Sequence, residues 1–453
     1  MIFERQKSKI VSHLSYFIGS AGSAFVVDPT RDIQQYLELA KKHGIRIKYI
    51  FETHRNEDYI IGSLELAKNT GAEIFHGPWP TIKYGNVVED GDEFTVGNLK
   101  VTALATPGHT PGCRSYTVTD METGSRPVLV CTGDVLFIGD TGRTDFGGPE
   151  NIKKWSRWMY ESIQEKLLPL GDHVILCPAH GSGSVCGSRI ASREYSTLGI
   201  EKIMNPQLAM NQDEFIKYKT AERHNYAPYF KRMEVLNVEG ASEYGIGPIV
   251  NALSVNEFED YINYGAIVVD TRPPPSFGSG YIKGSYNISI DRLSMAGWVL
   301  PYNEPILLVL GNKAELNDTV TGLARIGYDN FAGYLTPSIV SWYLKAKPVE
   351  RLGMLTTSEL RARLEMEEWT VLDVRSAEEY EAGHIENSIN IYVGTLPQHL
   401  TEIPKEKPIA LICKSGTRSG FGCSILARLG VTNINNVMGG MTSWLAAGYP
   451  FIK

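Results

Sequence analysis

Short apolar runs alternate with amphipathic stretches through the first half of the chain. Residues 23–28 and 47–51 have the length and composition of buried strands, and residues 33–43 between them have the apolar spacing of an amphipathic helix. Three further apolar runs, at residues 99–104, 128–131 and 174–177, each lead directly into a loop. This alternation predicts an α/β fold with candidate ligands just beyond the strand ends.

The second half of the chain contains an internal repeat of roughly 100 residues, a normal domain size. VVDTRPPPSFGSGYIKGSYNI (268–288) aligns without a gap with VLDVRSAEEYEAGHIENSINI (371–391), so that Asp270 pairs with Asp373, 103 positions later. Each copy has the order strand, turn, helix, strand, loop, helix. This order predicts a parallel sheet covered by helices.

These patterns predict three domains in a chain of 453 residues, which is too long for one ordinary core. We assign residues 1–240 to the first domain, 250–350 to the second and 351–453 to the third. Residues 223–247, in which Gly and Pro stand among aromatic residues, are the predicted linker between the first domain and the repeat.

The composition is that of a globular protein, with 43% hydrophobic and 21% charged residues. A net charge of −7 without Lys/Arg-rich runs argues against a nucleic-acid partner, and no apolar run approaches the roughly 18 residues of a membrane span. The charged N-terminus lacks a signal-peptide core, and six cysteines do not make a disulfide framework in a chain of this size. We therefore expect a cytoplasmic protein with no membrane partner that uses one or two thiols chemically. A homo-oligomer is compatible with the sequence.

One cysteine follows an apolar run in the second copy of the repeat. Residues 409–412 precede Cys413, and a helical pattern begins a few residues later. A thiol between a strand end and a helix N-terminus faces free backbone N–H groups, which favour a thiolate or an anionic persulfide. Arg418 adds positive charge for an anionic donor such as thiosulfate. We predict Cys413 and Arg418 as catalytic residues, with an anion-binding loop formed by Lys414, Ser415, Gly416 and Thr417. The alternative is a buried structural cysteine.

This loop resembles the active loop of the rhodanese family, which also has six residues from its cysteine to its arginine. The upstream segments DVR (373–375) and GHI (383–385) match patterns of that family as well. The resemblance implies that Cys413 accepts a sulfane sulfur, becomes a persulfide and passes the sulfur to a thiol or another acceptor.

The first copy of the repeat lacks the cysteine and the arginine of this loop. At the offset of 103 residues, Cys413 maps onto Leu310. Arg418 maps onto Glu315. His384, the histidine of the GHI segment that matches the family, maps onto Tyr281. Since this copy contains no cysteine, we predict a catalytically silent rhodanese-like domain.

The stretch ETHRNEDYIIG (52–62) follows a predicted strand in the first domain. It resembles the T-H-x-H-x-D-H motif of the metallo-β-lactamase superfamily, with His54 and Asp58 in place. Asn56 and Tyr59 stand where the motif has its other two histidines, so each position of a dinuclear zinc site loses one ligand. A two-zinc hydrolase is disfavoured on this ground.

Three ligand-type residues remain after separate strands, namely His54, His109 in TPGHTPG and Asp134 in TGD. Two histidines and one carboxylate form the facial triad of non-haem Fe(II) oxygenases. Residues 1–240 resemble the persulfide dioxygenases of the metallo-β-lactamase superfamily, through TPGHTPGC (106–113) and TGDVLFIGDTGRTDF (132–146). The resemblance implies an αβ/βα metallo-β-lactamase sandwich that holds one Fe(II) through these three residues, with zinc as the alternative metal. A decayed site kept as a scaffold is the competing interpretation.

Further residues are candidates for contacts with substrate or with the metal ligands: Asn56, Asp58, Tyr59, Arg143, His180 and Cys186. Arg143 would either hold a substrate carboxylate or order its loop. Cys186 would either handle sulfur, as in similar dioxygenase–rhodanese fusions, or be a bystander. Ser182 stands where some relatives carry a tyrosine near the iron. The four remaining cysteines are expected in the core: Cys113, Cys131, Cys177 and Cys423.

The predicted function is sulfide and persulfide metabolism. The first domain would oxidise a low-molecular-weight thiol persulfide with O2 to sulfite, and Cys413 would move sulfur between persulfide, sulfite and thiosulfate. One alternative is a zinc thioester hydrolase of the hydroxyacylglutathione hydrolase type fused to a sulfurtransferase. The other is a metal-free scaffold with sulfurtransferase activity only. No motif identifies the thiol that carries the persulfide.

Overall fold

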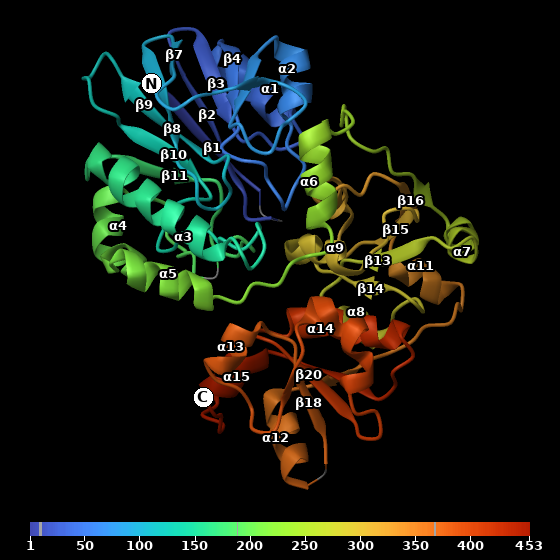
Figure 1. Ribbon diagram of the computed structural model, residues 1–453. Coiled ribbons are helices and arrows are strands. Elements are labelled where there is room, and N and C mark those ends of the chain that lie inside the picture. Colours follow the sequence, from blue (N-terminus) through green and yellow to red (C-terminus); the bar gives the residue numbers. More distant parts are fainter. Residues whose placement is uncertain (9–10, 188, 367) are drawn as a thin grey trace. The chain divides into compact units, whose positions relative to one another are not determined.

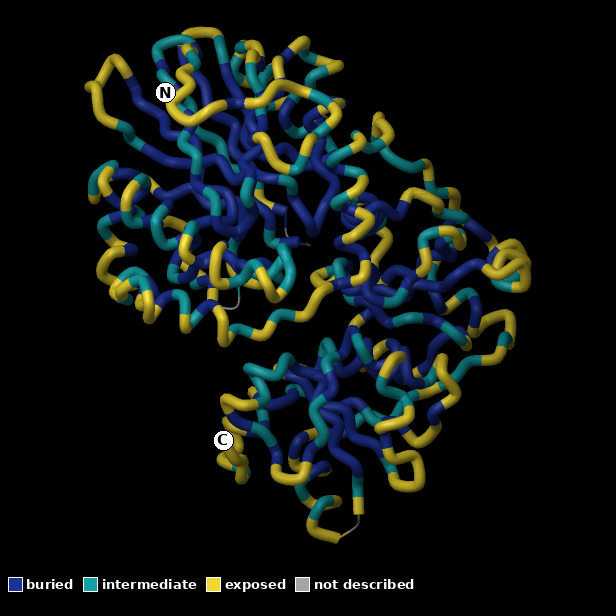
Figure 2. The backbone as a smooth tube through the Cα atoms, in the orientation of Figure 1, coloured by how far each residue is buried: buried dark blue, intermediate teal, exposed yellow. Residues whose placement is uncertain are grey.

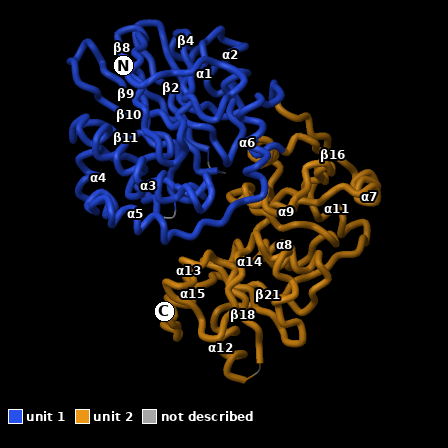
Figure 3. Tube along the Cα trace, in the orientation of Figure 1, with its two compact units in different colours: residues 1–246, 325–327 blue, residues 247–324, 328–453 orange. Residues whose placement is uncertain are grey.

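The computed structural model describes residues 1–8, 11–187, 189–366 and 368–453. The chain divides into two compact units, residues 1–246 with 325–327, and residues 247–324 with 328–453 (Figure 3). Both units combine β-sheets with helices, as the α/β prediction required. Among the described residues, no helix is long and apolar enough to cross a membrane.

The N-terminal unit is built on two sheets (Figure 1). The first has the order β1-β2-β3-β4-β5-β6 and contains β1 (Ile2–Lys7), β2 (Leu14–Ser20), β3 (Ser23–Val27), β4 (Arg46–Phe51), β5 (Glu73–His76) and β6 (Asn86–Val87). The second has the order β11-β10-β9-β8-β7 and contains β7 (Glu93–Val96), β8 (Leu99–Ala105), β9 (Arg114–Asp120), β10 (Leu129–Gly133) and β11 (Ile175–Pro178). Apolar side chains of both sheets form one core, in which the rings of Phe51 and Tyr116 lie 4.7 Å apart. In Figure 2 the central strands of both sheets, such as β2, β9 and β10, are buried, whereas β6 is exposed.

Helices cover the outer face of each sheet. Against the first sheet lie α1 (Gln34–His43) and α2 (Ser63–Thr70), which bury Tyr36 and Leu66 beside Ile50. Against the second sheet lie α3 (Ile152–Glu161), α4 (Leu198–Met204) and α5 (Gln212–Ala221), which contribute Met159, Leu198 and Phe215 to a second core. The order of layers is helix, sheet, sheet, helix, so the predicted αβ/βα sandwich is confirmed.

The linker predicted over residues 223–247 is wrong for its central part. Residues in this segment form helix α6 (Phe230–Glu239), and the compact N-terminal unit extends to Ile246. Phe230 and Met233 are buried, because their side chains lie on the inner face of the helix. The aromatic residues that suggested an irregular segment are therefore part of the packing of the first unit.

The second unit contains two sheets of the same strand order. The first sheet, β12-β16-β15-β13-β14, consists of β12 (Ala252–Leu253), β13 (Ile267–Asp270), β14 (Tyr286–Asn287), β15 (Ile306–Val309) and β16 (Phe331–Leu335). The second sheet, β17-β21-β20-β18-β19, consists of β17 (Gly353–Leu355), β18 (Thr370–Asp373), β19 (Ile389–Asn390), β20 (Ile409–Ile412) and β21 (Ile434–Val437). The ladders of both sheets are parallel, for example β13 with β15 and β18 with β20. The identical order follows from the sequence repeat.

Helices accompany both sheets of the second unit (Figure 1). The first sheet is accompanied by α7 (Val255–Asn263), α8 (Pro274–Ser279), α9 (Ala296–Val299), α10 (Leu316–Arg325) and α11 (Ile339–Leu344). The second is accompanied by α12 (Thr357–Met366), α13 (Ala377–Glu381), α14 (Thr417–Arg428) and α15 (Gly440–Ala446).

A buried ion pair is repeated in the two halves of the second unit. Arg272 donates from Nη2 to Asp270 Oδ2 over 2.6 Å, and Arg375 donates from Nη2 to Asp373 Oδ2 over the same distance. Each carboxylate is fully buried at the end of its strand. The arginine satisfies the buried charge and fixes the chain where it leaves the sheet. This framework is common to both copies.

Candidate metal centre and sulfur-transfer loop

The first candidate ligand, His54, follows β4 in a loop that is tied to both sheets. The backbone N–H of Arg114, at the start of β9, donates to Thr53 O over 2.7 Å. The Thr53 hydroxyl donates to Asp28 Oδ2 over 2.7 Å, so its oxygen can accept from His54 Nδ1, 2.9 Å away. This arrangement leaves Nε2 of His54 without a hydrogen and directed away from Thr53. Burial lowers the pKa of His54 to about 4, so the ring is neutral at pH 7.

His109 lies in the loop between β8 and β9. Its Nδ1 atom is 2.9 Å from the backbone oxygen of Arg143. Because a carbonyl oxygen only accepts hydrogen bonds, Nδ1 carries the hydrogen, and in the neutral ring Nε2 has a free lone pair. The ring is fully buried. Both histidines are thus held by the nitrogen that points away from the site, as metal-binding histidines commonly are.

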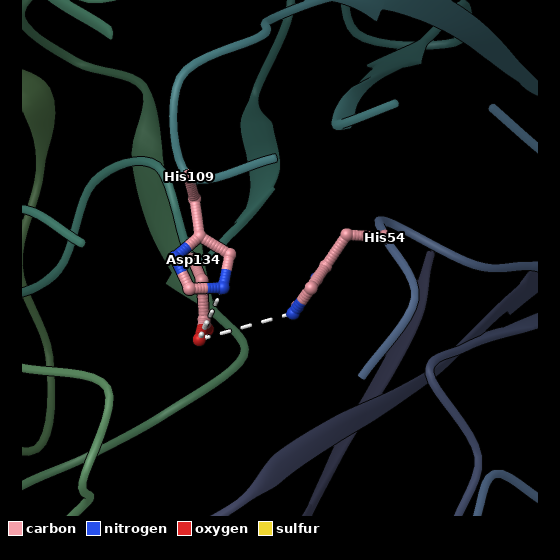
Figure 4. A group of neighbouring side chains, drawn as sticks. All are labelled: His54, His109 and Asp134. Carbon is pink, nitrogen blue, oxygen red and sulfur yellow. Dashed lines mark ion pairs between the residues drawn. The ribbon is translucent and has the colours of Figure 1, made fainter. Parts of the chain in front are cut away.

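Asp134 follows β10 and completes the group (Figure 4). Its Oδ2 atom lies 3.8 Å from His54 Nε2 and 3.7 Å from His109 Nε2. All three atoms are buried and have no hydrogen-bond partner among the described residues. Burial by itself would raise the pKa of Asp134, but the neighbouring histidines, His180 first, lower it well below its usual range. Two bare imidazole nitrogens and a carboxylate oxygen that face one another fit a divalent metal ion.

The strand directions explain why these side chains meet. Strands β8 and β10 are both antiparallel to β9, and β11 is parallel to β10, so their carboxyl ends lie at one edge of the sheet. His109, Asp134 and His180 follow these three ends. The predicted placement of ligands beyond strand ends is what the structure shows for this edge.

A second group of ligand-type side chains lies beside the first. Asp58, His180 and Cys186 are buried, and their ligand atoms all lie within 4.8 Å of one another. His180 Nε2 is 3.1 Å from Asp58 Oδ2. Burial raises the pKa of the Cys186 thiol well above its usual range, with smaller contributions from Asp134 and Asp58. The thiol is therefore protonated at neutral pH, and a cation beside it would be needed to form the thiolate.

Asn56 and Tyr59, at the two altered motif positions, make other contacts. The Asn56 side-chain amide donates to the backbone oxygen of His54 over 3.3 Å. The Tyr59 ring stacks on His13 with the centroids 4.1 Å apart. Neither contact joins these side chains to the imidazole of His54.

Arg143 is engaged within its own loop. Its Nε and Nη2 atoms donate to the two carboxylate oxygens of Asp145, each over 2.6 Å. The side chain is buried, and its Nη1 atom donates to Asn225 O over 3.3 Å. Of the two roles expected for Arg143, these contacts favour ordering the loop that supplies the carbonyl for His109.

Two residues near the motif were not predicted from the sequence. Asn237, on α6, donates to the backbone oxygens of Asn56 and Tyr59 over 2.7 and 2.8 Å, and accepts from Ile61 N–H over 3.0 Å. Glu57 is buried inside the motif, with its Oε2 atom 3.5 Å from His109 Nε2. The motif pattern gave no role to position 57, so Glu57 was not expected in the site. Asn56 and Asn237 are 181 positions apart, so no local sequence pattern indicates their contact.

In the second unit, Cys413 lies between β20 and α14. Its Sγ atom accepts from the backbone N–H of Gly416 over 3.1 Å. The Ser419 hydroxyl lies 3.4 Å from the sulfur and donates its hydrogen to Asn436 Oδ1 over 2.6 Å. Gly416 has φ +97°, and a side chain there would meet the backbone of Val437 at 3.2 Å. Glycine is therefore needed to turn the amide toward the sulfur. Ser419 lies one residue beyond the predicted loop.

The other residues of this loop differ in their exposure and contacts. Lys414 and Ser415 are exposed, and Thr417 is half-buried. Arg418 donates from Nη1 and Nη2 to the two oxygens of Glu379, over 2.6 and 2.7 Å. Burial by itself would raise the pKa of Glu379, but the hydrogen bonds from Arg418 outweigh it and lower this pKa. Arg418 is thus fixed by a bidentate pair.

The corresponding region of the first copy is built from other side chains. Leu310, at the position of Cys413, is buried. The Tyr281 hydroxyl donates to Glu350 Oε2 over 3.2 Å. All six cysteines of the chain are unpaired and buried, which fits the core positions expected for four of them.

Comparisons with known proteins place both halves of the chain. Residues 9–180 match the Metallo-beta-lactamase superfamily, and residues 356–447 match the Rhodanese-like domain. The mitochondrial persulfide dioxygenase ETHE1 of Bos taurus is 30% identical over 207 residues, which cover 45% of this chain and 74% of the relative. The probable metallo-hydrolase YqgX of Bacillus subtilis (strain 168) is 30% identical over 190 residues, which cover 37% of this chain and 84% of the relative.

Among solved structures, a metallo-beta-lactamase from Staphylococcus aureus subsp. aureus COL is 30% identical, with a TM-score of 0.65. The likeness covers 74% of this chain and 98% of the other. Since the N-terminal unit consists mainly of residues 1–246, the likeness extends into the second unit.

Proposed function

Because this chain belongs to the persulfide dioxygenase family of the metallo-beta-lactamase superfamily and carries a C-terminal rhodanese-like domain, we propose that it oxidises thiol persulfides and transfers their sulfur. In the first reaction a low-molecular-weight persulfide, O2 and water yield the thiol and sulfite. In the second, sulfane sulfur moves through Cys413 between a persulfide, sulfite and thiosulfate.

The observation that carries the first activity is the convergence of three unpartnered, buried ligand atoms on His54, His109 and Asp134. A bound Fe(II) would supply open coordination positions for O2 and for the persulfide sulfur. The residues of the chain hold the two imidazoles in the tautomer with a bare Nε2 and keep the carboxylate ionised. Burial of all three side chains excludes bulk water from the reacting sulfur.

For the second activity, the sulfur of Cys413 is the acceptor. Cys413 attacks the outer sulfur of a persulfide, forms a new S–S bond, and releases the thiol with the proton. Sulfite then attacks the outer sulfur of the Cys413 persulfide, which breaks that S–S bond and gives thiosulfate and the free cysteine. The Gly416 N–H stabilises negative charge on sulfur in both steps. The reverse sequence consumes thiosulfate.

Joining both activities in one chain raises the effective concentration of sulfite at the rhodanese-like domain. The test is O2 uptake by the iron-loaded protein with a thiol persulfide. We expect uptake to be lost in His54→Ala and largely kept in Cys413→Ser, with thiosulfate transfer showing the opposite pattern. Equal loss of O2 uptake in both variants would contradict this division of labour.

A second candidate for the N-terminal unit is a zinc hydrolase of thioesters. It is favoured by the group of Asp58, His180 and Cys186, which offers three ligand types for a second ion, and by the likeness to a probable metallo-hydrolase. About two zinc ions per chain with thioester hydrolysis would support it, whereas one iron with O2 uptake would exclude it. A metal-free scaffold predicts no stoichiometric metal while sulfur transfer is intact.

A further inference from the structure

Glu57 points into the group of metal-ligand atoms from the motif loop itself. Its Oε2 atom lies 3.5 Å from His109 Nε2 and 3.9 Å from His54 Nε2. The side chain is fully buried, and Oε2 has no hydrogen-bond partner among the residues that the structure describes. An unpartnered carboxylate oxygen in a buried site is costly unless a cation or a donor faces it.

The other carboxylate oxygen of Glu57 is occupied. Arg55 donates from Nη2 to Glu57 Oε1 over 3.1 Å, and the same nitrogen lies 3.2 Å from Glu234 Oε1. The Tyr226 hydroxyl donates to this Glu234 oxygen over 2.6 Å. These contacts hold the outer side of Glu57 and leave Oε2 directed toward the two histidines.

In the neutral form and in the tautomer that its own loop favours, neither imidazole supplies a hydrogen to Glu57 Oε2. His109 Nδ1 donates to Arg143 O, and His54 Nδ1 donates to Thr53 Oγ1. Both Nε2 atoms therefore present lone pairs to the site, together with one oxygen each from Asp134 and Glu57. Four electron-rich atoms that face one another repel unless a positive ion lies among them.

We propose that Glu57 is a fourth protein ligand of the same metal ion. Adjacent ligand atoms around such an ion lie about 3.0–3.6 Å apart, given metal–ligand distances of about 2.0–2.2 Å. The Nε2 atoms of His54 and His109 lie 3.5–3.9 Å from Glu57 Oε2 and Asp134 Oδ2, and small side-chain rotations would shorten these distances to that range. This inference rests on the proposed function, because it concerns the ion that the dioxygenase activity requires.

A second carboxylate changes what the site can hold. Asp134 and Glu57 together carry two negative charges, so a divalent ion makes the buried group electrically neutral. With four protein ligands, a six-coordinate ion would keep two positions open for the persulfide sulfur and O2. The extra hard oxygen ligand also compensates for the nitrogen ligands that Asn56 and Tyr59 do not supply.

The test compares Glu57→Gln and Glu57→Ala with Glu52→Gln. Glu52 is an equally buried carboxylate in the same stretch of the chain, directly after β4, but it accepts from the Tyr84 hydroxyl over 3.1 Å. Each protein is loaded anaerobically with Fe(II), and the metal affinity is measured by chelator competition, with folding checked by circular dichroism. We expect both Glu57 variants to bind iron at least about tenfold more weakly, and Glu52→Gln to keep the affinity of the natural protein.

A crystal of the natural protein with zinc provides a readout that needs no variant. A Glu57 oxygen about 2.0–2.2 Å from the ion supports the proposal. If the natural protein binds one metal at His54, His109 and Asp134 while Glu57 stays outside the shell and Glu57→Gln keeps its affinity, the proposal is wrong and the dioxygenase function survives. If the natural protein binds no metal at all, the proposed function fails with it.

Discussion

His180 holds Asp134 by one oxygen and leaves the other free: His180 Nδ1 lies 2.7 Å from Asp134 Oδ1, while Oδ2 faces His54 and His109. His180 is therefore a positioning residue for the carboxylate. We predict that His180→Ala lowers iron affinity by about 10–100-fold, as loss of such partners commonly does. His180→Asn, whose amide can replace Nδ1, should recover part of the loss. His173→Ala, at an exposed histidine, is the control, and an unchanged affinity in His180→Ala would remove this role.

Asn237 ties helix α6 to the motif loop through three hydrogen bonds. Asn237→Ala leaves buried backbone groups without partners, so we predict a loss of about 1–3 kcal/mol in the free energy of unfolding. Urea-induced unfolding followed by circular dichroism measures it. Asn98→Ala is the matched control, because the Asn98 amide donates to an exposed glutamate, Glu122. Equal midpoints for the two variants would show that α6 is dispensable for the loop.

Metal removal should separate the two activities. We predict that dialysis against a chelator abolishes O2 uptake and leaves thiosulfate transfer intact, because the candidate metal ligands belong to the first unit and Cys413 belongs to the second. The N-terminal unit should also become less stable, since an ion present at 100 times its Kd contributes about 2.7 kcal/mol. A parallel loss of both activities on chelation, both restored by iron, would contradict the assignment.

Sulfur labelling should be confined to one thiol. We predict that incubation with thiosulfate adds one sulfur to Cys413 and none to Cys423, because burial raises the pKa of Cys423. Lys414 and Arg418 place the two cysteines on different tryptic peptides, so mass spectrometry of alkylated digests distinguishes them. In Cys413→Ser the rhodanese-like repeat should take up no label, since its first copy contains no cysteine.

The Glu379–Arg418 pair predicts a defined pH dependence of stability. Because the pKa of Glu379 is lowered in the folded protein, the pair stabilises fully above the unfolded pKa of about 4.3, and its contribution disappears as pH falls through the folded pKa. The difference in unfolding free energy between the natural protein and Glu379→Gln should stay constant from about pH 7 to 5 and shrink below about pH 4. Glu368→Gln should show a much smaller change in the same direction, because solvent screens its exposed pair with Lys407. A constant difference down to about pH 3 would rule out the pair as its source.

The fold was largely predictable because the apolar periodicity and the repeat are local signals. The strands expected at 47–51 and 409–412 correspond to β4 and β20, and the ligand-type residues stand where those patterns stop. The linker prediction failed at α6, because Gly, Pro and aromatic residues suggest irregular structure when their packing partners are unknown. The bounds of the three predicted domains stay predictions.

Residues of the site could be predicted only where they belong to a sequence motif. His54, His109 and Asp134 were expected together and are brought together. Asn237 acts through a helix almost two hundred positions away, and the direction of Glu57 depends on Arg55 and the turn of the loop. Cys186 was open to two interpretations, and its position beside Asp58 and His180 follows only from the folded chain.

The Asp–Arg pair is present in both copies, at 270/272 and at 373/375, so the shared architecture does not depend on the residues of the cysteine loop. Both copies keep the same frame, yet only the second contains cysteine. For protein engineering, the first copy thus offers the same frame without a cysteine. Grafting the hexapeptide at 413–418 onto positions 310–315 would install a second sulfur carrier without disturbing the pair that anchors the chain.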